Sequence, residues 1–152
     1  MRVLFCMLLC SLGAAAMAQT GEADFAQRLA AARASWQSAA PADYRYGFNK
    51  YCDCHRDTPP ETLVSVAGGV VTDVRHVMAK TGDTVPAAAN NFDLYWTIED
   101  LFGLLERASE RGATVRATFD AELGRPEQIF IDYLPDIVGD EVDVRITRFE
   151  SG

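Results

Sequence analysis

Residues 97–112 read TIEDLFGLLERASERG, and this stretch predicts an amphipathic helix that divides the chain into two runs of strands. Thr97 is a residue type that caps helix N-termini, and Asp100 stands at the third helical position, from which its side chain can bond back to the cap. Trp96, before the cap, can pack against the first turns. The apolar stripe is formed by Ile98, Leu101, Phe102, Leu105 and Ala108. Gly112 supplies the C-terminal stop.

On the C-terminal side of this helix the sequence predicts three strands. Ala113–Phe119 alternates apolar and polar residues, which is the period of a strand with one buried face. A turn over Asp120–Pro126 joins it to Glu127–Leu134, and the last strand is expected at Glu141–Phe149. These segments are close enough in sequence to pair as an antiparallel meander.

On the N-terminal side the pattern is similar. Residues Glu22–Gln37 carry apolar side chains at helical spacing, and a strand beginning at Tyr44 follows. Leu63–Ala67 and Val70–Val77 flank a Gly-Gly pair suited to a tight hairpin turn, and Lys80–Asn91 is a polar connecting loop. The chain therefore predicts an α+β fold with an antiparallel sheet of about six strands and two helices on one face. Because the order helix, strand, strand, strand occurs twice, a tandem αβββ repeat is an alternative.

The N-terminus has the features of a cleavable export signal. Arg2 is followed by an uncharged run, and Ala16-Met17-Ala18 provides small residues for cleavage before Gln19. The uncharged run is shorter than the roughly 20 residues of a membrane-spanning helix, and neither Cys6 nor Cys10 follows the small residue that a lipoprotein signal requires. We therefore expect a signal peptide over 1–18, a single domain over 19–152, and a periplasmic or secreted protein without a membrane span.

The charge of the chain excludes some classes of partner. The formal net charge is −8 at pH 7. An acidic surface repels phosphate backbones and anionic lipid head groups, so nucleic acids and membrane surfaces are poor candidates.

Cleavage before Gln19 would leave Cys52 and Cys54 as the cysteines of the exported chain. In an oxidising compartment each is the other's intramolecular partner, so a disulfide is the default expectation. A ring over one intervening residue removes little unfolded-chain entropy, so the bond would fix a local conformation. A structural disulfide is favoured over two alternatives: a strained redox-active disulfide, and a thiolate metal site with His55 as a further ligand and His76 arriving from the hairpin.

A second group of candidate ligands lies in the acidic stretch near the C-terminus. Asp132, Asp136 and Asp140, followed by Glu141 and Asp143, could bind calcium through carboxylate oxygens. The spacing lacks the glycine and the final glutamate of an EF-hand loop, so a solvated acidic turn is favoured over a metal site.

The sequence gives little support for catalysis. No serine stands in a G-x-S-x-G motif and no phosphate-binding glycine loop occurs, so no catalytic residue and no cofactor is expected. The aromatic residues of the first strand could form a ligand-binding surface, but at strand spacing they are more often core: Tyr44, Tyr46, Phe48 and Tyr51.

Several short patterns occur together in the chain. They are Tyr44-Arg45-Tyr46 leading to Cys52-Asp53-Cys54, Val64-x-Val66-x-x-Gly69-x-Val71, Thr97-Ile98 with Leu101-Phe102, and Phe119-Asp120-x-x-x-Gly124-x-Pro126 before Ile129-x-Ile131-Asp132. In these patterns the chain resembles a family of small secreted bacterial proteins and lipoproteins catalogued as a domain of unknown function, numbered 6174. The resemblance implies a bacterial envelope setting and supplies no catalytic residue.

From these observations we expect an exported, non-enzymatic module that binds a protein or a small ligand in the bacterial envelope. Two alternatives stay open. One is a thiol-disulfide or metal-dependent activity centred on Cys52, Cys54 and His55, and the other is an inhibitor of a secreted enzyme.

Overall fold

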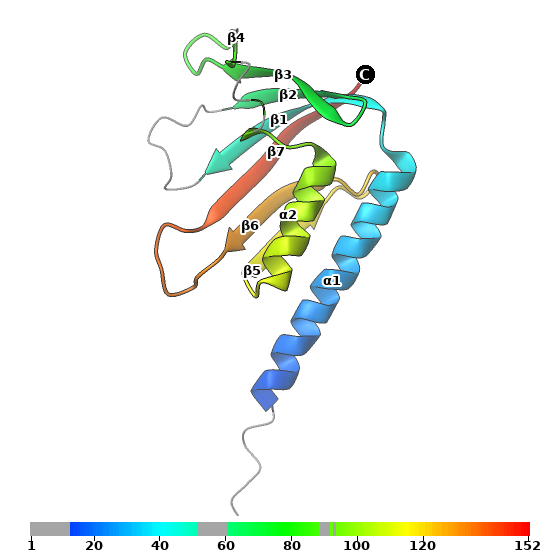
Figure 1. Ribbon diagram of the computed structural model, residues 1–152, viewed down its shortest axis with the longest axis vertical. Coiled ribbons are helices and arrows are strands. Elements are labelled where there is room, and N and C mark those ends of the chain that lie inside the picture. Colours follow the sequence, from blue (N-terminus) through cyan, green and yellow to red (C-terminus); the bar gives the residue numbers. More distant parts are fainter. Residues whose placement is uncertain (1–12, 52–60, 89–91, 93) are drawn as a thin grey trace, which may run out of the picture.

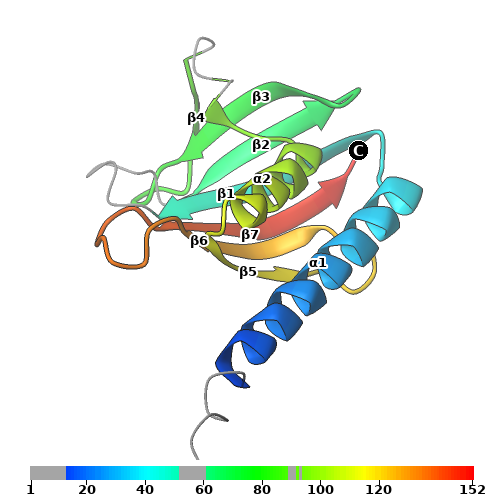
Figure 2. The ribbon, with the colours of Figure 1, turned by 60° about the horizontal axis from the view of Figure 1, so that its bottom comes forward.

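The fold is a seven-stranded antiparallel sheet with both helices on one of its faces (Figures 1 and 2). The computed structural model describes residues 13–51, 61–88, 92 and 94–152, with the backbone alone for 13–22. Its elements are α1 (Gly13–Ala39), β1 (Asp43–Tyr51), β2 (Thr62–Ala67), β3 (Val70–Val77), β4 (Thr84–Pro86), α2 (Ile98–Glu110), β5 (Thr114–Phe119), β6 (Pro126–Asp132) and β7 (Val142–Ser151). The predicted α+β class and antiparallel sheet are confirmed.

Two elements differ from the expectation. The short strand β4 pairs with β3 inside the segment that the sequence predicts as a loop, and it has only three residues. Helix α1 begins at Gly13, whereas the apolar spacing predicts a start at Glu22. Its first turns are rich in alanine, which has the highest helix propensity and no amphipathic pattern to detect.

The order of the strands is β4-β3-β2-β1-β7-β6-β5, so the first and last long strands pair at the centre. Both meanders, β1 to β3 and β5 to β7, progress across the sheet in the same direction, yet β1 and β5 run antiparallel. A rotation that superimposed β1–β3 on β5–β7 would have to turn the sheet over. Two true copies would therefore have their helices on opposite faces of the sheet. Because α1 and α2 share one face, the two αβββ units are not copies of each other in space (Figure 2). The repeat alternative is therefore not supported by the topology.

The N-terminus of α2 is fixed to the sheet by two tyrosines of β1. Thr97 and Asp100 form the predicted capping box, with the Thr97 hydroxyl accepting from the Asp100 N–H and the Asp100 carboxylate accepting from the Thr97 N–H. The Tyr44 hydroxyl accepts a 2.9 Å hydrogen bond from the Ile98 N–H, and the Tyr46 hydroxyl donates to the Trp96 carbonyl. The predicted stripe of α2 is buried as expected.

Helix α1 packs beside α2 on the same face. Trp36 meets the rings of Tyr44 and Phe149 at centroid distances of 5.4 and 5.9 Å. Arg33 bridges the helices, with Nη1 2.6 Å from Oε1 of Glu106 and further bonds to Glu99. The β5–β6 turn lies against the C-terminal half of α1, so the core is closed between both helices and the centre of the sheet.

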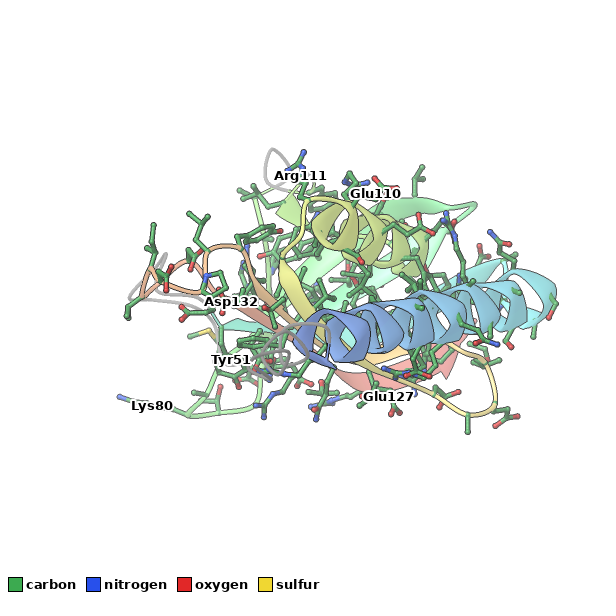
Figure 3. All side chains as sticks on the ribbon, turned by 90° about the horizontal axis from the view of Figure 1, so that it is seen from below. Tyr51, Lys80, Glu110, Arg111, Glu127 and Asp132 are labelled. Atoms are coloured by element: carbon green, nitrogen blue, oxygen red, sulfur yellow. The ribbon has the colours of Figure 1, made fainter. Side chains whose placement is uncertain are left out.

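The topology gathers several connections at one end of the sheet. Strands β1, β3 and β6 run parallel to one another, so their last residues lie at the same end of the sheet. Among the described residues this end holds Tyr51, the last residue of β1, and the connections 78–83 and 133–141, and we call it the loop end. Figure 3 shows Tyr51, Lys80 and Asp132 together there.

Candidate binding surface

The loop end carries most of the exposed large apolar side chains. Five of the eight such residues among those the structure describes are found there: Tyr51 (53% exposed), Met78 (47%), Leu134 (53%), Ile137 (52%) and Val138 (96%). Three of them belong to the short connection between β6 and β7. Exposed apolar residues that cluster at loop tips mark interaction sites more often than those scattered singly over a surface.

Acidic residues accompany the apolar side chains of the β6–β7 connection. Asp136 is exposed in the β6–β7 connection, and Asp132 closes β6 at its base. In the same connection the Gly139 N–H donates a 2.8 Å hydrogen bond to Glu141. Both carboxylate oxygens of Asp140 are buried without a hydrogen-bond partner among the described residues. The loop end thus combines an apolar tip with negative charge.

The predicted metal ligands do not come together as far as the structure describes them. His76 lies in β3, where its Nδ1 is 3.1 Å from the Thr62 hydroxyl and its ring lies 6.2 Å from that of Tyr95. Within the described ranges, no group of three or more His, Cys, Asp or Glu residues could hold a metal ion. Cys52, Cys54 and His55 lie outside the described residues, so the predicted disulfide and the thiolate site stay predictions.

The aromatic residues of β1 divide between core and surface. Tyr44, Tyr46 and Phe48 are buried under the helices, as the core interpretation predicts, whereas Tyr51 is more than half exposed. Burial raises the pKa of Tyr44 to about 12, and burial raises the pKa of Tyr46 well above its usual value. These hydroxyls stay neutral at physiological pH and act as hydrogen-bonding anchors for α2.

The face of the sheet opposite the helices carries polar and aromatic side chains, and no helix of the described chain covers it (Figure 2). The strand register aligns a row of side chains across four strands: Arg116, Phe130, Asp143 and Tyr51. A second row lies beside it: Thr118, Gln128, Arg145 and Asn49. The two rows place cations against aromatic rings and are the most ordered chemical pattern on this face.

Cation–π contacts join the members of these rows. The Arg116 guanidinium lies 4.2 Å from the centroid of the Phe130 ring, and that of Arg145 lies 5.4 Å from the Tyr51 ring. A shallow hollow of about 260 Å³ opens between the rows. It is lined by Arg116, Ala117, Thr118, Gln128, Ile129, Phe130 and Asp143. The hollow offers hydrogen-bond donors and acceptors beside an aromatic ring.

The sequence indicates the acidic residues of 132–140 and Tyr51 as candidates, but neither the apolar tip beside them nor the two rows on the open face. The pattern Leu134-Pro135-Asp136-Ile137-Val138-Gly139 places two adjacent aliphatic residues between turn-forming residues, and it could have indicated an exposed tip. The rows on the open face could not be found in this way, because they depend on the register of four strands, which alternation alone leaves undetermined.

Comparison with known proteins gives one result. A protein-family model matches residues 28–151, and it is described as a family of unknown function (DUF6174). This confirms the family that the sequence motifs indicate. No curated protein and no solved structure matches the chain. Within the described residues, no helix has the length and apolar character needed to cross a membrane.

Proposed function

Because the chain belongs to the DUF6174 family, whose function is unknown, we propose a function from its surface: it is an exported, non-enzymatic binding module that contacts a partner protein through its loop end. The single observation that carries this proposal is the clustering of exposed apolar side chains there, with Val138 96% exposed at the tip. A soluble domain gains nothing in stability from such residues, so a binding role accounts for them better.

The chemistry of the loop end suggests the partner. Protein interfaces commonly have an apolar centre surrounded by a polar rim, and electrostatic complementarity selects the partner and speeds association. Ile137 and Val138 would provide the centre, and Asp132 and Asp136 the negative rim. The matching surface on the partner is an apolar pocket edged by lysine or arginine side chains.

The rigid sheet behind these loops supports a recognition role. The two connections that follow β3 and β6 are each held at both ends by paired strands, so their geometry is set by the sheet. The Met78 N–H, for example, donates a 2.8 Å hydrogen bond to the Asp83 carbonyl and closes the 78–83 connection. Binding residues on loops positioned by a rigid scaffold lose less conformational entropy when a partner binds.

Export is part of the proposal and is compatible with the packing. Cleavage before Gln19 would fall within α1, but the buried residues of that helix lie further along, from Phe25 to Trp36. The exported chain would keep the core contacts that Phe25, Leu29 and Trp36 make. The bacterial envelope is the compartment that we propose on this basis.

A more specific form of the proposal is inhibition of a secreted enzyme. A projecting tip with a highly exposed aliphatic side chain is suited to enter a cleft, and Val138 is such a side chain. This form predicts that the partner loses activity when the module binds.

The proposal is tested by affinity capture from periplasmic extract with matched variants. The bait is the chain from Gln19 onward, compared with an Ile137→Asp/Val138→Asp variant and with Val70→Asp. Val70 is 60% exposed at the opposite end of β3 and serves as the control for an added charge. We expect one protein to bind the wild type and the Val70 variant saturably and to be lost from the loop variant. The same captured set on all three baits, with all three folded by circular dichroism, would rule out the loop end.

A further inference from the structure

We propose a second binding site, separate from the loop end: the outer edge of β5 takes an extended acidic peptide segment of a partner protein, with a carboxylate of that peptide against Arg116. Strand β5 is the last in the order of the sheet and pairs with β6 alone. No described residue hydrogen-bonds to its backbone from the other side. Alternate residues of this six-residue strand therefore present unpaired N–H and C=O groups at the outer edge, which an added strand can bind.

The register of the sheet predicts the chemistry of the residue that would stand opposite Arg116. A strand added at this edge would extend the row Arg116, Phe130, Asp143 and Tyr51 by one position. Directly opposite residues on neighbouring strands have Cβ atoms about 4.5–5.5 Å apart, within reach of an ion pair. The new position is next to a cation, so an aspartate or glutamate is favoured there.

Arg116 is also the arginine of these rows that has no acidic partner among the described residues. Arg145, in the second row, pairs with Asp143 at 3.4 Å, and Arg148, further along β7, pairs with Glu61 at 2.6 Å. Arg116 instead lies over the ring of Phe130, and this contact holds the guanidinium in place while the residue stays exposed. A preorganised, unpaired guanidinium is a suitable group to bind a carboxylate.

The hollow provides room for a second side chain of the same peptide. Thr118 stands two residues after Arg116 on the same face of β5 and lines the hollow together with Gln128. Alternate residues of an added strand point to the same face, so the neighbour of the carboxylate along this face would lie beside Thr118. A threonine or valine fits there, because cross-strand pairs of β-branched residues are favourable.

A second copy of this chain is a poorer occupant of the same edge. Strand β5 has the sequence TVRATF and carries no carboxylate, so pairing β5 with another β5 would bring two arginines together without a counter-charge. Charge complementarity therefore selects an acidic segment of a different protein.

The test is a titration with two blocked peptides, followed by the backbone amide signals in nuclear magnetic resonance. The first peptide alternates threonine and valine around a central glutamate, and the second replaces this glutamate by glutamine. With the first peptide we expect shifts concentrated on the amides of Thr114–Phe119. The glutamine peptide and an Arg116→Gln variant should each bind at least about fivefold more weakly, as expected for the loss of a charge-assisted hydrogen bond.

Two controls separate this site from a nonspecific effect and from the loop end. Arg111→Gln removes an exposed arginine at the end of α2 and should leave peptide binding unchanged. The Ile137→Asp/Val138→Asp variant should also bind the peptide normally, even if it has lost its protein partner. Equal affinity for both peptides, shifts spread away from β5, or dimerisation of the chain through β5 would each overturn the proposal.

Discussion

The backbone N–H of Ile98 donates a 2.9 Å hydrogen bond to the hydroxyl of Tyr44, so the first residue of α2 is joined directly to the second residue of β1. Tyr44→Phe leaves this N–H buried without a partner. We expect the free energy of unfolding to fall by about 1–3 kcal/mol in urea denaturation. Tyr51→Phe, at an exposed tyrosine of the same strand, should change it by less than about 0.5 kcal/mol. Equal effects of the two substitutions would contradict an anchoring role for Tyr44.

The raised pKa of Tyr44 predicts that the stability of the fold depends on pH in the alkaline range. Burial raises the pKa of Tyr44 from 10.0 to about 12 in the folded state. A raised pKa means that the folded state holds its proton more tightly, so this contribution to stability is complete below pH 10 and is lost as the pH rises towards about 12. Urea unfolding at intervals of pH should show a steeper alkaline decline for wild type than for Tyr44→Phe. Parallel declines would show that Tyr44 does not contribute.

Gly47 has no side chain, and the Glu61 carboxylate occupies the place that a side chain would take. A Cβ at this position would lie 2.6 Å from Oε1 of Glu61 and would also collide with the Thr147 hydroxyl. Glu61 is held in place by two hydrogen bonds from Arg148, at 3.0 and 2.6 Å. We expect Gly47→Ala to destabilise the fold by about 1–3 kcal/mol, because it displaces this ion pair.

A double-mutant cycle measures this relationship. Glu61→Ala alone should cost about 1 kcal/mol, because the Glu61 side chain is only 13% exposed and loses its hydrogen bonds from Arg148 and Thr147. Added to Gly47→Ala, it should restore part of the lost stability, so the two effects are not additive. Additive effects would mean that the collision with Glu61 is not what makes Gly47→Ala destabilising.

Gly124 combines a left-handed backbone with a close approach to α1. Its φ is +76°, and a Cβ there would lie 2.8 Å from Cβ of Ser35 and collide with the Ala32 carbonyl. We expect Gly124→Ala to lower the free energy of unfolding by about 2–4 kcal/mol. Gly68→Ala is the matched control, because its φ is +57° with no atom near the added Cβ, and it should cost about 1 kcal/mol. Similar losses at both positions would mean that contact with α1 is unimportant.

The disulfide expected between Cys52 and Cys54 has a direct test in the exported chain. Alkylation under denaturing conditions should add no mass before reduction and two alkyl groups after it. Uptake of reagent at both cysteines without reduction would contradict the disulfide. If the bond forms but its reduction potential is strongly oxidising, the redox alternative gains support.

The parts of the fold that the sequence predicts are those with local causes. The cap at Thr97 and the stripe from Ile98 to Ala108 depend on neighbouring residues, and both appear in the structure as expected. The turn at Gly68 and Gly69 is local as well, with both residues at positive φ. The sequence does not predict strand β4, because its three residues have no pattern of their own and depend on pairing with β3.

The candidate surfaces show the same difference between features with local causes and features that depend on strand pairing. The acidic residues of 132–140 were recognised from their type, but their place beside an apolar tip follows from the direction in which β6 leaves the sheet. The alignment of Arg116 with Phe130 and Asp143 depends on two strand registers. Alternation in each strand predicts which residues share a face and does not predict which of them are neighbours.

The pairing of β1 with β7 at the centre of the sheet sets the order in which the protein can be completed. Tyr44 lies opposite Ser151, so the middle of the sheet joins residues from the two ends of the domain. A chain that is synthesised or exported N-terminus first can form the hairpin of β2 and β3 early. Strand β1 can pair with β2 at that stage, but its other edge stays unpaired until β7 is available. Folding is therefore expected to follow synthesis or export rather than accompany it, and a chain that stops before Val142 would leave two separate half-sheets.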